Sequence, residues 1–438
     1  MTPTRKLATV AVAALMAGGC MASIESARTE DEAAEAYVRL VLGVGTHDAD
    51  YVDAYYGPPE WRTEVESAAP SLLDLNKRAA ALEVDLRRLP AIEAGATDAE
   101  LRTLRRQYLA RQLQALRARV AMLRDTRLTF DQESRELYDA VAPRHTDDEF
   151  QGVLDTLGAR LPGEGAINER YAAFRQAFVI PTERLDAVFQ AAIAACRDRT
   201  AAHVALPEGE RFTVEYVTGK SWSGYNWYQG QFRSLIQVNT DLPIYIDRAI
   251  DLACHEGYPG HHVYNVLLEQ ALVRDRGWRE FTVYPLFSPQ SLIAEGTANF
   301  GIEVAFSRED RLQFERDVLF PLAGLDPARV EEYYEVLALT ERLSYAGNEA
   351  ARRYLDGQID RAAAEAWLVA HAMSTPAQAA QRVRFFDQYR SYVINYNLGK
   401  DMVRQYIEGQ GGTEADRERR WQAFTELLSS PRLPSGLQ

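Results

Sequence analysis

The chain is poor in cysteine, in positive charge and in long apolar runs. Three cysteines among 438 residues are too few for the disulfide framework of a small secreted domain. After the N-terminal segment, no stretch reaches the roughly 18 uninterrupted apolar residues that a transmembrane helix needs. Lysine and arginine number 49 against 63 aspartates and glutamates, which argues against nucleic acid as a partner. With 47% hydrophobic residues, the chain has ample material for a large core.

The first 19 residues are expected to be a signal peptide and not part of the fold. Two basic residues precede the apolar run 7–16, which is too short to span a bilayer as a stable helix. The run leads into Ala-Gly-Gly-Cys at residues 17–20, which resembles the end of a bacterial lipoprotein signal. We therefore expect Cys20 to carry lipid and to anchor a periplasmic protein. Met21 follows in place of the aspartate that retains lipoproteins in an inner membrane, which favours an outer membrane. The alternative is an ordinary secretory peptide that releases the protein.

Two cysteines remain if Cys20 is lipidated. An oxidising compartment would permit a disulfide between Cys196 and Cys254. We expect each of them to be a small buried residue on a helix, and the disulfide is the alternative. Cys254 directly precedes a histidine, but the two side chains point about 100° apart on a helix, so we do not count Cys254 as a metal ligand.

The remaining pattern is mainly helical. Leucines at alternating three- and four-residue spacing predict a long helix over residues 98–124. Alternation predicts strands at 212–217 and 234–239, and we interpret 219–230 as an aromatic loop between them. We expect a bilobal helical fold with a small sheet beside a central cleft. Residues 20–438 would form one domain, which could divide into lobes of about 26–205 and 206–438.

Three of the seven histidines fall within residues 255–262, which read H-E-G-Y-P-G-H-H. Two neutral imidazoles can bind zinc, and the adjacent Glu256 can take a proton from the attacking water. In the usual H-E-x-x-H motif the two histidines lie one helical turn apart. Here the second histidine comes six or seven residues after His255. On an unbroken helix His262 would share the face of His255 but lie roughly 10 Å further along the axis, too far for one ion.

The Pro259-Gly260 pair removes this objection. Proline cannot donate to the helix ladder and glycine accepts unusual dihedral angles, so a local bulge can draw a later histidine back towards His255. The alternative is a helix end whose histidines are solvated. As a third ligand we propose Glu295, which is flanked by small and apolar residues, because a carboxylate is costly to bury there unless it binds a cation. Asn299, one turn later, could orient it; the alternative is a glutamate that faces solvent.

The run H-E-G-Y-P-G-H-H followed by A-E-G-x-A resembles the bacterial domain-of-unknown-function 885 family, whose members typically read H-E-A-Y-P-G-H-H and E-G-W-A. That family is grouped with gluzincin-type zinc metallopeptidases, similar in arrangement to helical carboxypeptidases and oligopeptidases with H-E-x-G-H. The resemblance implies that His261, at the Gly-His step, is the second ligand. His262 would then turn towards a neighbouring group or the substrate. The resemblance weakly covers residues 36–408, and Thr297 departs from the tryptophan of the family motif.

The resemblance also implies roles for two C-terminal residues. Tyr396 matches a tyrosine three residues before glycine, and in related peptidases a tyrosine hydroxyl steadies the oxyanion. Arg390 could bind a substrate carboxylate through its planar fork. The alternatives are a packed core tyrosine and a surface ion pair. Two further candidates for substrate binding are Tyr225 in the aromatic loop and Asn239 at the end of strand 234–239, which could pair with an extended substrate backbone.

These observations predict a lipid-anchored periplasmic zinc hydrolase that acts on peptides. His255, His261 and Glu295 would hold one zinc ion, and Glu256 would be the general base. Another divalent cation that accepts imidazole and carboxylate is an alternative to zinc. Two rival functions stay open: a zinc amidase acting on a non-peptide amide, and a metal-binding lipoprotein without turnover. The intact Glu256 argues against the second. The substrate, exo- or endopeptidase preference and oligomeric state are left open.

Overall fold

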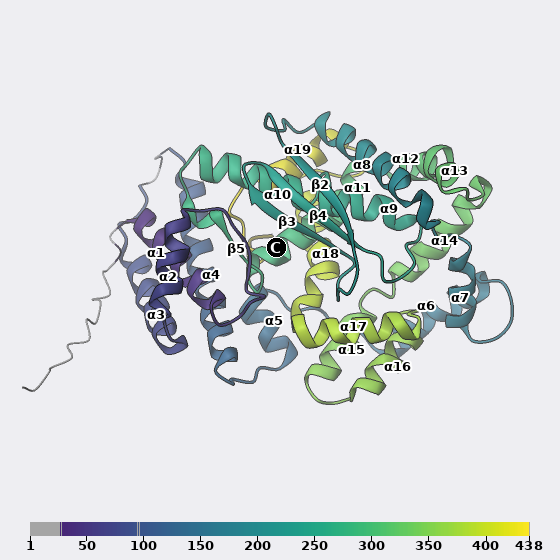
Figure 1. Cartoon of the computed structure of the whole chain (residues 1–438), viewed down its shortest axis with the longest axis horizontal. Helices are drawn as coiled ribbons and strands as arrows, with labels where there is room; N and C mark the ends of the chain where they lie inside the picture. The colour runs from purple at the N-terminus through teal and green to yellow at the C-terminus, as the bar shows by residue number, and fades with distance from the viewer. Residues whose placement is uncertain (1–26, 28, 94, 96, 438) are drawn as a thin grey trace, which may run out of the picture.

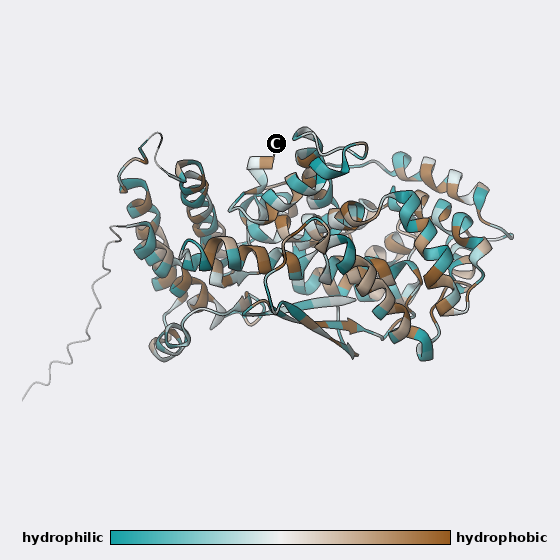
Figure 2. Cartoon of the chain, turned by 90° about the horizontal axis from the view of Figure 1, so that it is seen from above, coloured by the Kyte–Doolittle hydropathy of each residue, from teal (hydrophilic) through white to brown (hydrophobic). Residues whose placement is uncertain are grey.

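The computed structural model describes residues 27, 29–93, 95 and 97–437. The expected signal peptide and the lipidation of Cys20 fall outside these residues and stay predictions. The fold is mainly helical with a small sheet, as the sequence predicted (Figure 1). Figure 2 shows hydrophilic and hydrophobic residues side by side along most helices, as expected for helices that bury one face. None of the described helices is both long and apolar enough to cross a bilayer.

The first half of the chain is a series of helices with one short strand among them. Local signals set several of the helix starts: Thr29 and Glu32 form a reciprocal capping box, and Thr129 does the same with Gln132. In chain order the elements are α1 (Glu30–Gly45), β1 (Val52–Tyr55), α2 (Pro59–Ala68), α3 (Leu72–Arg88), α4 (Ala99–Leu123), α5 (Phe130–Tyr138), α6 (Asp147–Arg160), α7 (Ile167–Gln176), η1 (Thr182–Arg184) and α8 (Leu185–Ala201).

Three strands follow α8 and form the main sheet, with β4 between the other two. The strands are β2 (Arg211–Val217), β3 (Gly224–Gly230) and β4 (Arg233–Asn239). β2 runs parallel to β4, and β3 runs antiparallel to it. The expected aromatic loop is therefore wrong for its second half, which is strand β3. Its residues do alternate between buried and exposed from Asn226 to Gly230, but glycine and aromatic residues hid this pattern.

The middle of the chain carries the histidine motif and leads into the second half. Its elements are α9 (Asp247–Leu252), the wide turn η2 (Ala253–Gly257), α10 (His261–Leu268), η3 (Glu269–Arg274), η4 (Arg279–Thr282), β5 (Val283–Pro285) and α11 (Pro289–Ala305). β5 pairs antiparallel with β1, so an early segment of the chain lies beside a late one.

The remaining helices complete the second half. They are α12 (Arg308–Phe314), η5 (Glu315–Leu319), α13 (Phe320–Ala323), η6 (Pro327–Arg329), α14 (Val330–Glu341), α15 (Ala346–Leu355), α16 (Arg361–His371), α17 (Pro376–Tyr389), η7 (Arg390–Val393), α18 (Ile394–Gly409), α19 (Arg417–Leu428) and η8 (Pro434–Leu437). In Figure 1, α18 descends from below the sheet to α17.

Two glycines let α11 and α18 cross at very short range. A Cβ atom on Gly296 would lie 2.5 Å from the backbone of Gly399, and one on Gly399 would lie 2.8 Å from the carbonyl oxygen of Leu292. Only glycine fits at such a crossing. The crossing brings the residues at the start of α18 next to the carboxylate of Glu295 on α11.

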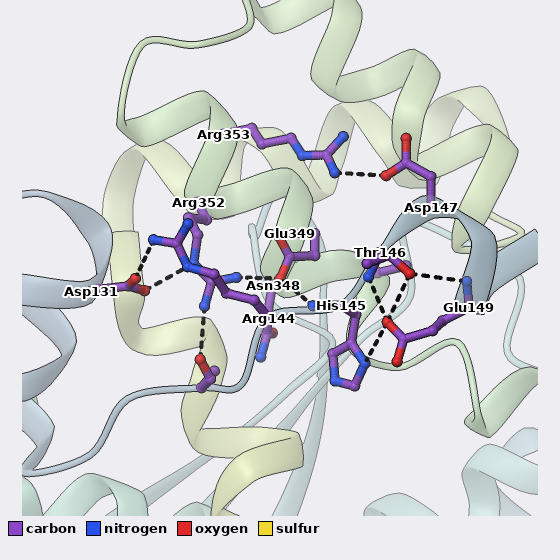
Figure 3. A network of polar contacts seen from close by, with 12 residues as sticks. Asp131, Arg144, His145, Thr146, Asp147, Glu149, Asn348, Glu349, Arg352 and Arg353 are labelled. Atoms are coloured by element: carbon purple, nitrogen blue, oxygen red, sulfur yellow. Dashed lines mark hydrogen bonds and ion pairs between the residues drawn. The ribbon is translucent and has the colours of Figure 1, made fainter.

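Polar contacts join the early helices to the late ones. Arg352 of α15 donates to the carboxylate of Asp131 at 2.9 Å and to the carbonyl oxygen of Ala142 at 2.9 Å, and it also pairs with Glu349 (Figure 3). Glu349 in turn accepts a hydrogen bond from the backbone of His145 at 3.1 Å. This network ties α5 and the loop before α6 to α15. The expected division into two lobes near residue 205 stays a prediction.

The two remaining cysteines are bonded to each other. Cys196 of α8 and Cys254 of η2 form a disulfide with a Cα–Cα distance of 5.7 Å. Both are fully buried on helical segments, as expected, and the disulfide that the sequence left open as the alternative is present. Their spacing in the sequence could not reveal the contact, which depends on how α8 packs against η2. The disulfide fixes the turn that carries His255 to a neighbouring helix.

Candidate metal site and its cavity

The helix that carries the histidine motif is interrupted between its two candidate ligands. After α9 the backbone widens into η2, and the amide of Gly260 donates to the carbonyl oxygen of Cys254 at 2.9 Å. α10 then begins at His261. The interruption removes the axial separation of a continuous helix, so the imidazole rings of His255 and His261 lie 4.6 Å apart between centroids. The predicted bulge at Pro259-Gly260 is confirmed.

Glycine is required at position 260 by the close approach of the backbone. A Cβ atom there would lie 1.9 Å from the carbonyl oxygen of His255 and 2.5 Å from that of Cys254. Neither backbone atom can move away without displacing η2. The shape of the bulge therefore depends on this one glycine.

Replacing Gly260 with alanine is expected to destabilise the protein by at least about 1–3 kcal/mol, the usual cost of overpacking, and to weaken metal binding. Chemical denaturation and metal content measure the two effects. Gly347→Ala is the matched control, because a Cβ on Gly347 in α15 meets no atom within 4 Å. If Gly260→Ala had the same metal content and the same free energy of unfolding as Gly347→Ala, the bulge would not be what holds the ligands in place.

Three side chains converge as the sequence predicted. Nε2 of His255 lies 3.3 Å from Oε2 of Glu295, and Nε2 of His261 lies 3.7 Å from the same oxygen. One ligand atom from each of the three side chains lies within 4.8 Å of the other two. These residues come from η2, α10 and α11, which pack against one another.

This geometry fits a metal ion. Ligand atoms at about 2.0–2.2 Å from a tetrahedral zinc are separated by roughly 3.3–3.6 Å. The two distances to Glu295 are close to this range. In addition, Oε2 of Glu295 is buried and accepts no hydrogen bond from the described residues. A buried carboxylate oxygen without a donor is costly unless a cation satisfies it. Two imidazole nitrogens and one carboxylate oxygen are a donor set that zinc accepts.

The other oxygen of Glu295 is fixed by a residue that sequence reasoning did not single out. The hydroxyl of Tyr392, in η7, donates to Oε1 of Glu295 at 2.8 Å. The sequence predicted that Asn299 orients this carboxylate, and that prediction is wrong. Its amide donates to the backbone oxygen of Glu295 at 3.0 Å and to that of Tyr396 at 3.3 Å, because a side chain one turn later reaches the backbone of its own helix first.

The electrostatics of the cluster show how strongly these groups interact. Burial lowers the pKa of His261, but the nearby carboxylate of Glu295 outweighs this effect and raises the pKa to about 9. Burial raises the pKa of Glu295, but His255 and His261 together hold it well below its usual range. Without metal, the cluster therefore carries a proton on His261 at neutral pH. A divalent cation would replace that proton, so its affinity should fall as the pH decreases.

Glu256 lies beside the cluster and outside it. Its carboxylate is buried, and burial raises its pKa, an effect that His255 and His261 partly offset. Its backbone oxygen accepts a hydrogen bond from the amide of Asn226 at 2.7 Å. A Cβ atom on Gly224 would lie 2.7 Å from Oε1 of Glu256, so this carboxylate lies directly against strand β3. A carboxylate with a raised pKa close to a metal site has the properties of a general base.

A cavity of about 440 Å³ opens onto these residues. The candidate ligands and Glu256 form one wall, the start of β3 forms a second, and aromatic residues of α17, η7 and α18 form a third. Tyr225 and Tyr396, both predicted from the sequence, line this cavity. Burial raises the pKa of Tyr396 well above its usual range, and Glu295 raises it further. The hydroxyl of Tyr396 is therefore protonated and able to donate a hydrogen bond.

His262 does not line the cavity, contrary to the expectation that it binds substrate. It is fully buried, with Nδ1 2.9 Å from the hydroxyl of Ser234 and Nε2 3.0 Å from Oε2 of Glu210. Being the next residue of α10, it points about 100° away from His261. The same carboxylate accepts from the hydroxyl of Tyr258 at 2.6 Å. His262 therefore joins α10 to the sheet.

Two further expected substrate contacts are also absent from the cavity wall. Arg390 pairs with the buried carboxylate of Glu133 at 2.7 Å, the ion pair that was the alternative. Asn239 donates to the carbonyl oxygens of Lys220 at 3.1 Å and of Trp222 at 2.9 Å, so it holds the loop before β3. Both side chains therefore bind groups within the protein and not a ligand in the cavity.

The strand expected to pair with substrate cannot do so. β4 has β2 on one side and β3 on the other, so its backbone groups are already used. β3 pairs with β4 along one edge only, and Gly224, Tyr225 and Asn226 at its start line the cavity. An extended peptide backbone would therefore meet β3 and not β4.

Asp53 of β1 is a cavity residue that sequence reasoning missed. Its carboxylate accepts a hydrogen bond from the hydroxyl of Tyr225. Burial raises the pKa of Asp53 to about 6, against the opposing effects of Tyr225 and His261. No local pattern could have indicated it, because β1 reaches the site through contacts with distant segments, namely its pairing with β5 and its contact with β3.

The comparisons with known proteins support the fold and leave the function open. No family model matches the chain, and no curated protein matches it. A crystal structure of a candidate lipoprotein from Colwellia psychrerythraea has a TM-score of 0.51 at 15% identity, over 94% of this chain and 75% of that one. A candidate lipoprotein of unknown function from Shewanella oneidensis has a TM-score of 0.41 at 13% identity, over 85% of this chain and 79% of that one. The resemblance to the domain-of-unknown-function 885 family stays a hypothesis.

Proposed function

We propose that the protein is a metal-dependent hydrolase that cleaves amide bonds in peptides, with zinc as its metal. One observation carries the proposal: His255, His261 and Glu295 converge beside a buried carboxylate, Glu256, which is not one of the converging ligands. Structural zinc sites are closed by four protein ligands, whereas catalytic sites have three and keep a position open. A bound zinc ion would act as a Lewis acid that activates water and polarises the amide carbonyl.

The residues of the chain have separate tasks in this proposal. Glu256 takes the proton from the attacking water and passes it to the leaving amine, which its raised pKa favours. Tyr396 donates its hydroxyl hydrogen to the oxygen on which negative charge develops. Tyr392 holds Glu295 in position through its 2.8 Å hydrogen bond. The cavity wall formed by β3 presents backbone groups to an extended substrate, which favours a peptide over a small amide.

We also propose that the protein is anchored by lipid in the bacterial envelope, with its catalytic part in the periplasm. The basic start, the short apolar run and the Gly-Gly-Cys ending at Cys20 support this location. The description of the Colwellia protein of similar fold as a candidate lipoprotein is in keeping with it. Met21, in place of the aspartate that retains lipoproteins in an inner membrane, favours the outer membrane where the host has one.

Incubation with a mixed peptide library tests the proposed activity. We expect new peptide ends, identified by mass spectrometry, that disappear after chelation and return when zinc is added. A parallel set of acylated amino acids and cell-wall fragments tests the amidase alternative. Cleavage that persists after complete removal of metal would contradict the proposal, and so would the absence of cleavage of every amide by the zinc-loaded protein.

A further inference from the structure

An arginine in the cavity wall has neither an ion-pair nor a hydrogen-bond partner among the residues that the structure describes. Arg382, on α17, lines the cavity that also contains the three candidate ligands. Among the residues that the structure describes, no carboxylate lies within 4.0 Å of its guanidinium, and no hydrogen bond to it is formed. The other cavity arginine, Arg248, differs because it pairs with Asp251 at 3.6 Å and donates to Ser223 at 3.3 Å.

The surroundings of Arg382 leave its hydrogen-bonding edge available. Its guanidinium carbon lies 5.0 Å from the ring centre of Phe385 and 5.8 Å from that of Tyr396. Aromatic faces stabilise the charge of a guanidinium but do not use its N–H groups. Burial lowers the pKa of Arg382, and no nearby carboxylate opposes this effect. Burying a cation without a counter-ion costs free energy, and a bound anion would offset that cost.

Two neighbouring polar side chains of α17 already make hydrogen bonds within the protein. Gln378 accepts from the backbone of Thr375 in the capping box of α17, at 2.9 Å. Gln381 donates to the carbonyl oxygen of Lys220 at 3.3 Å. The planar fork of arginine matches a carboxylate with two parallel hydrogen bonds. The cavity holds about 440 Å³, room for a ligand of small-molecule size, and thus for the end of a peptide more readily than for its middle.

We propose that Arg382 binds the C-terminal carboxylate of the substrate, so that the enzyme removes residues from the C-terminus of peptides. This inference rests on the proposed function and specifies its substrate class. Phe385, Tyr389 and Tyr396 line the cavity around Arg382, so the terminal residue is expected to be aromatic or otherwise apolar. Arg382 takes the role that the sequence had suggested for Arg390.

Two matched peptides test the preference for a free C-terminus. They share one sequence ending in phenylalanine, one with a free carboxylate and one with a C-terminal amide. We expect the wild-type enzyme to show a kcat/KM about 10–100-fold higher for the free acid, the range of a charge-assisted pair of hydrogen bonds. Arg382→Gln should reduce the ratio to about one by slowing only the free acid. Arg382→Lys should restore part of it, since the charge returns without the fork.

The control variant for this test is Arg248→Gln. Arg248→Gln changes a cavity arginine that is already paired, so it should change the kcat/KM values for the two peptides by a similar factor. An acid-to-amide ratio that depends on Arg248 and not on Arg382 would overturn the assignment. A peptide with an amidated C-terminus and a terminal glutamate, if cleaved as fast as the free acid, would overturn the assignment to the C-terminal carboxylate.

A binding measurement separates this inference from the proposed function. Calorimetry with 3-phenylpropanoate on the full chain after chelation reports carboxylate binding without turnover and without metal. We expect binding that Arg382→Gln weakens at least about 10-fold and Arg248→Gln leaves within about 3-fold. Equal binding by wild type and Arg382→Gln would overturn the inference while leaving the proposed function intact. Binding that depends on Arg382, with no peptide cleaved by the zinc-loaded enzyme, would support the carboxylate site and contradict the proposed function.

Discussion

Replacing Glu256 with glutamine is expected to lower turnover by at least about 10²–10⁴-fold, the range of general acid–base catalysis, while metal content stays unchanged. The expectation follows from position, because Glu256 lies in the cavity beside the three converging ligands and is not one of them. Glutamine keeps the shape of the side chain but cannot accept the proton. Steady-state kinetics on a cleaved peptide and metal analysis of the same preparation measure the two quantities.

The matched control for this variant is Glu303→Gln. Glu303 lies on α11, the helix that carries Glu295, but it pairs with Lys400 at 2.8 Å and Arg404 at 2.6 Å and does not line the cavity. The Glu303→Gln enzyme should keep nearly the wild-type turnover. A Glu256→Gln enzyme that was as active as this control would end the role assigned to Glu256, and loss of metal from it would mean that Glu256 is itself a ligand.

The paired histidines are expected to differ sharply in metal binding. His261→Ala removes one of three ligands and should weaken zinc binding by more than the roughly 10–100-fold typical of an outer hydrogen-bond partner of a ligand. His262→Ala should retain the metal, because its ring contacts Ser234 and Glu210 and lies outside the cavity. It should instead lower the free energy of unfolding by about 1–3 kcal/mol, since it removes a hydrogen-bond donor from the buried carboxylate of Glu210.

Zinc titration followed by calorimetry and urea denaturation separates the two effects. His262→Gln should recover part of the lost stability, because an amide can still donate to Glu210. If His262→Ala lost zinc and His261→Ala kept it, the bulge would present the opposite histidine from the one seen in the structure.

Most of the metal site was predictable because three of its residues lie close together in the sequence. His255, Glu256 and His261 lie within seven positions, and the Pro259-Gly260 step between them indicates a bulge. Glu295 could be found because a carboxylate among small and apolar residues requires a partner. The structure brings His255, His261 and Glu295 together as predicted.

The rest of the cavity could not be predicted because it depends on contacts between distant segments. Arg390 and Arg382 lie eight residues apart, and only packing shows that Arg390 is neutralised by Glu133 while Arg382 is not. Likewise, Tyr392 reaches Glu295 only because glycines let α11 and α18 cross closely. The sequence of strand β3 predicts a loop, since its glycine and aromatic residues lack the β-branched pattern of a typical strand.

The central claim is that His255, His261 and Glu295 hold one metal ion, and anomalous X-ray scattering tests it most directly. Crystals of the protein grown with zinc would be measured on both sides of the zinc absorption edge. We predict one strong anomalous peak per chain, located between Nε2 of His255, Nε2 of His261 and Oε2 of Glu295. With zinc in excess, the absence of a peak at this position would contradict the claim.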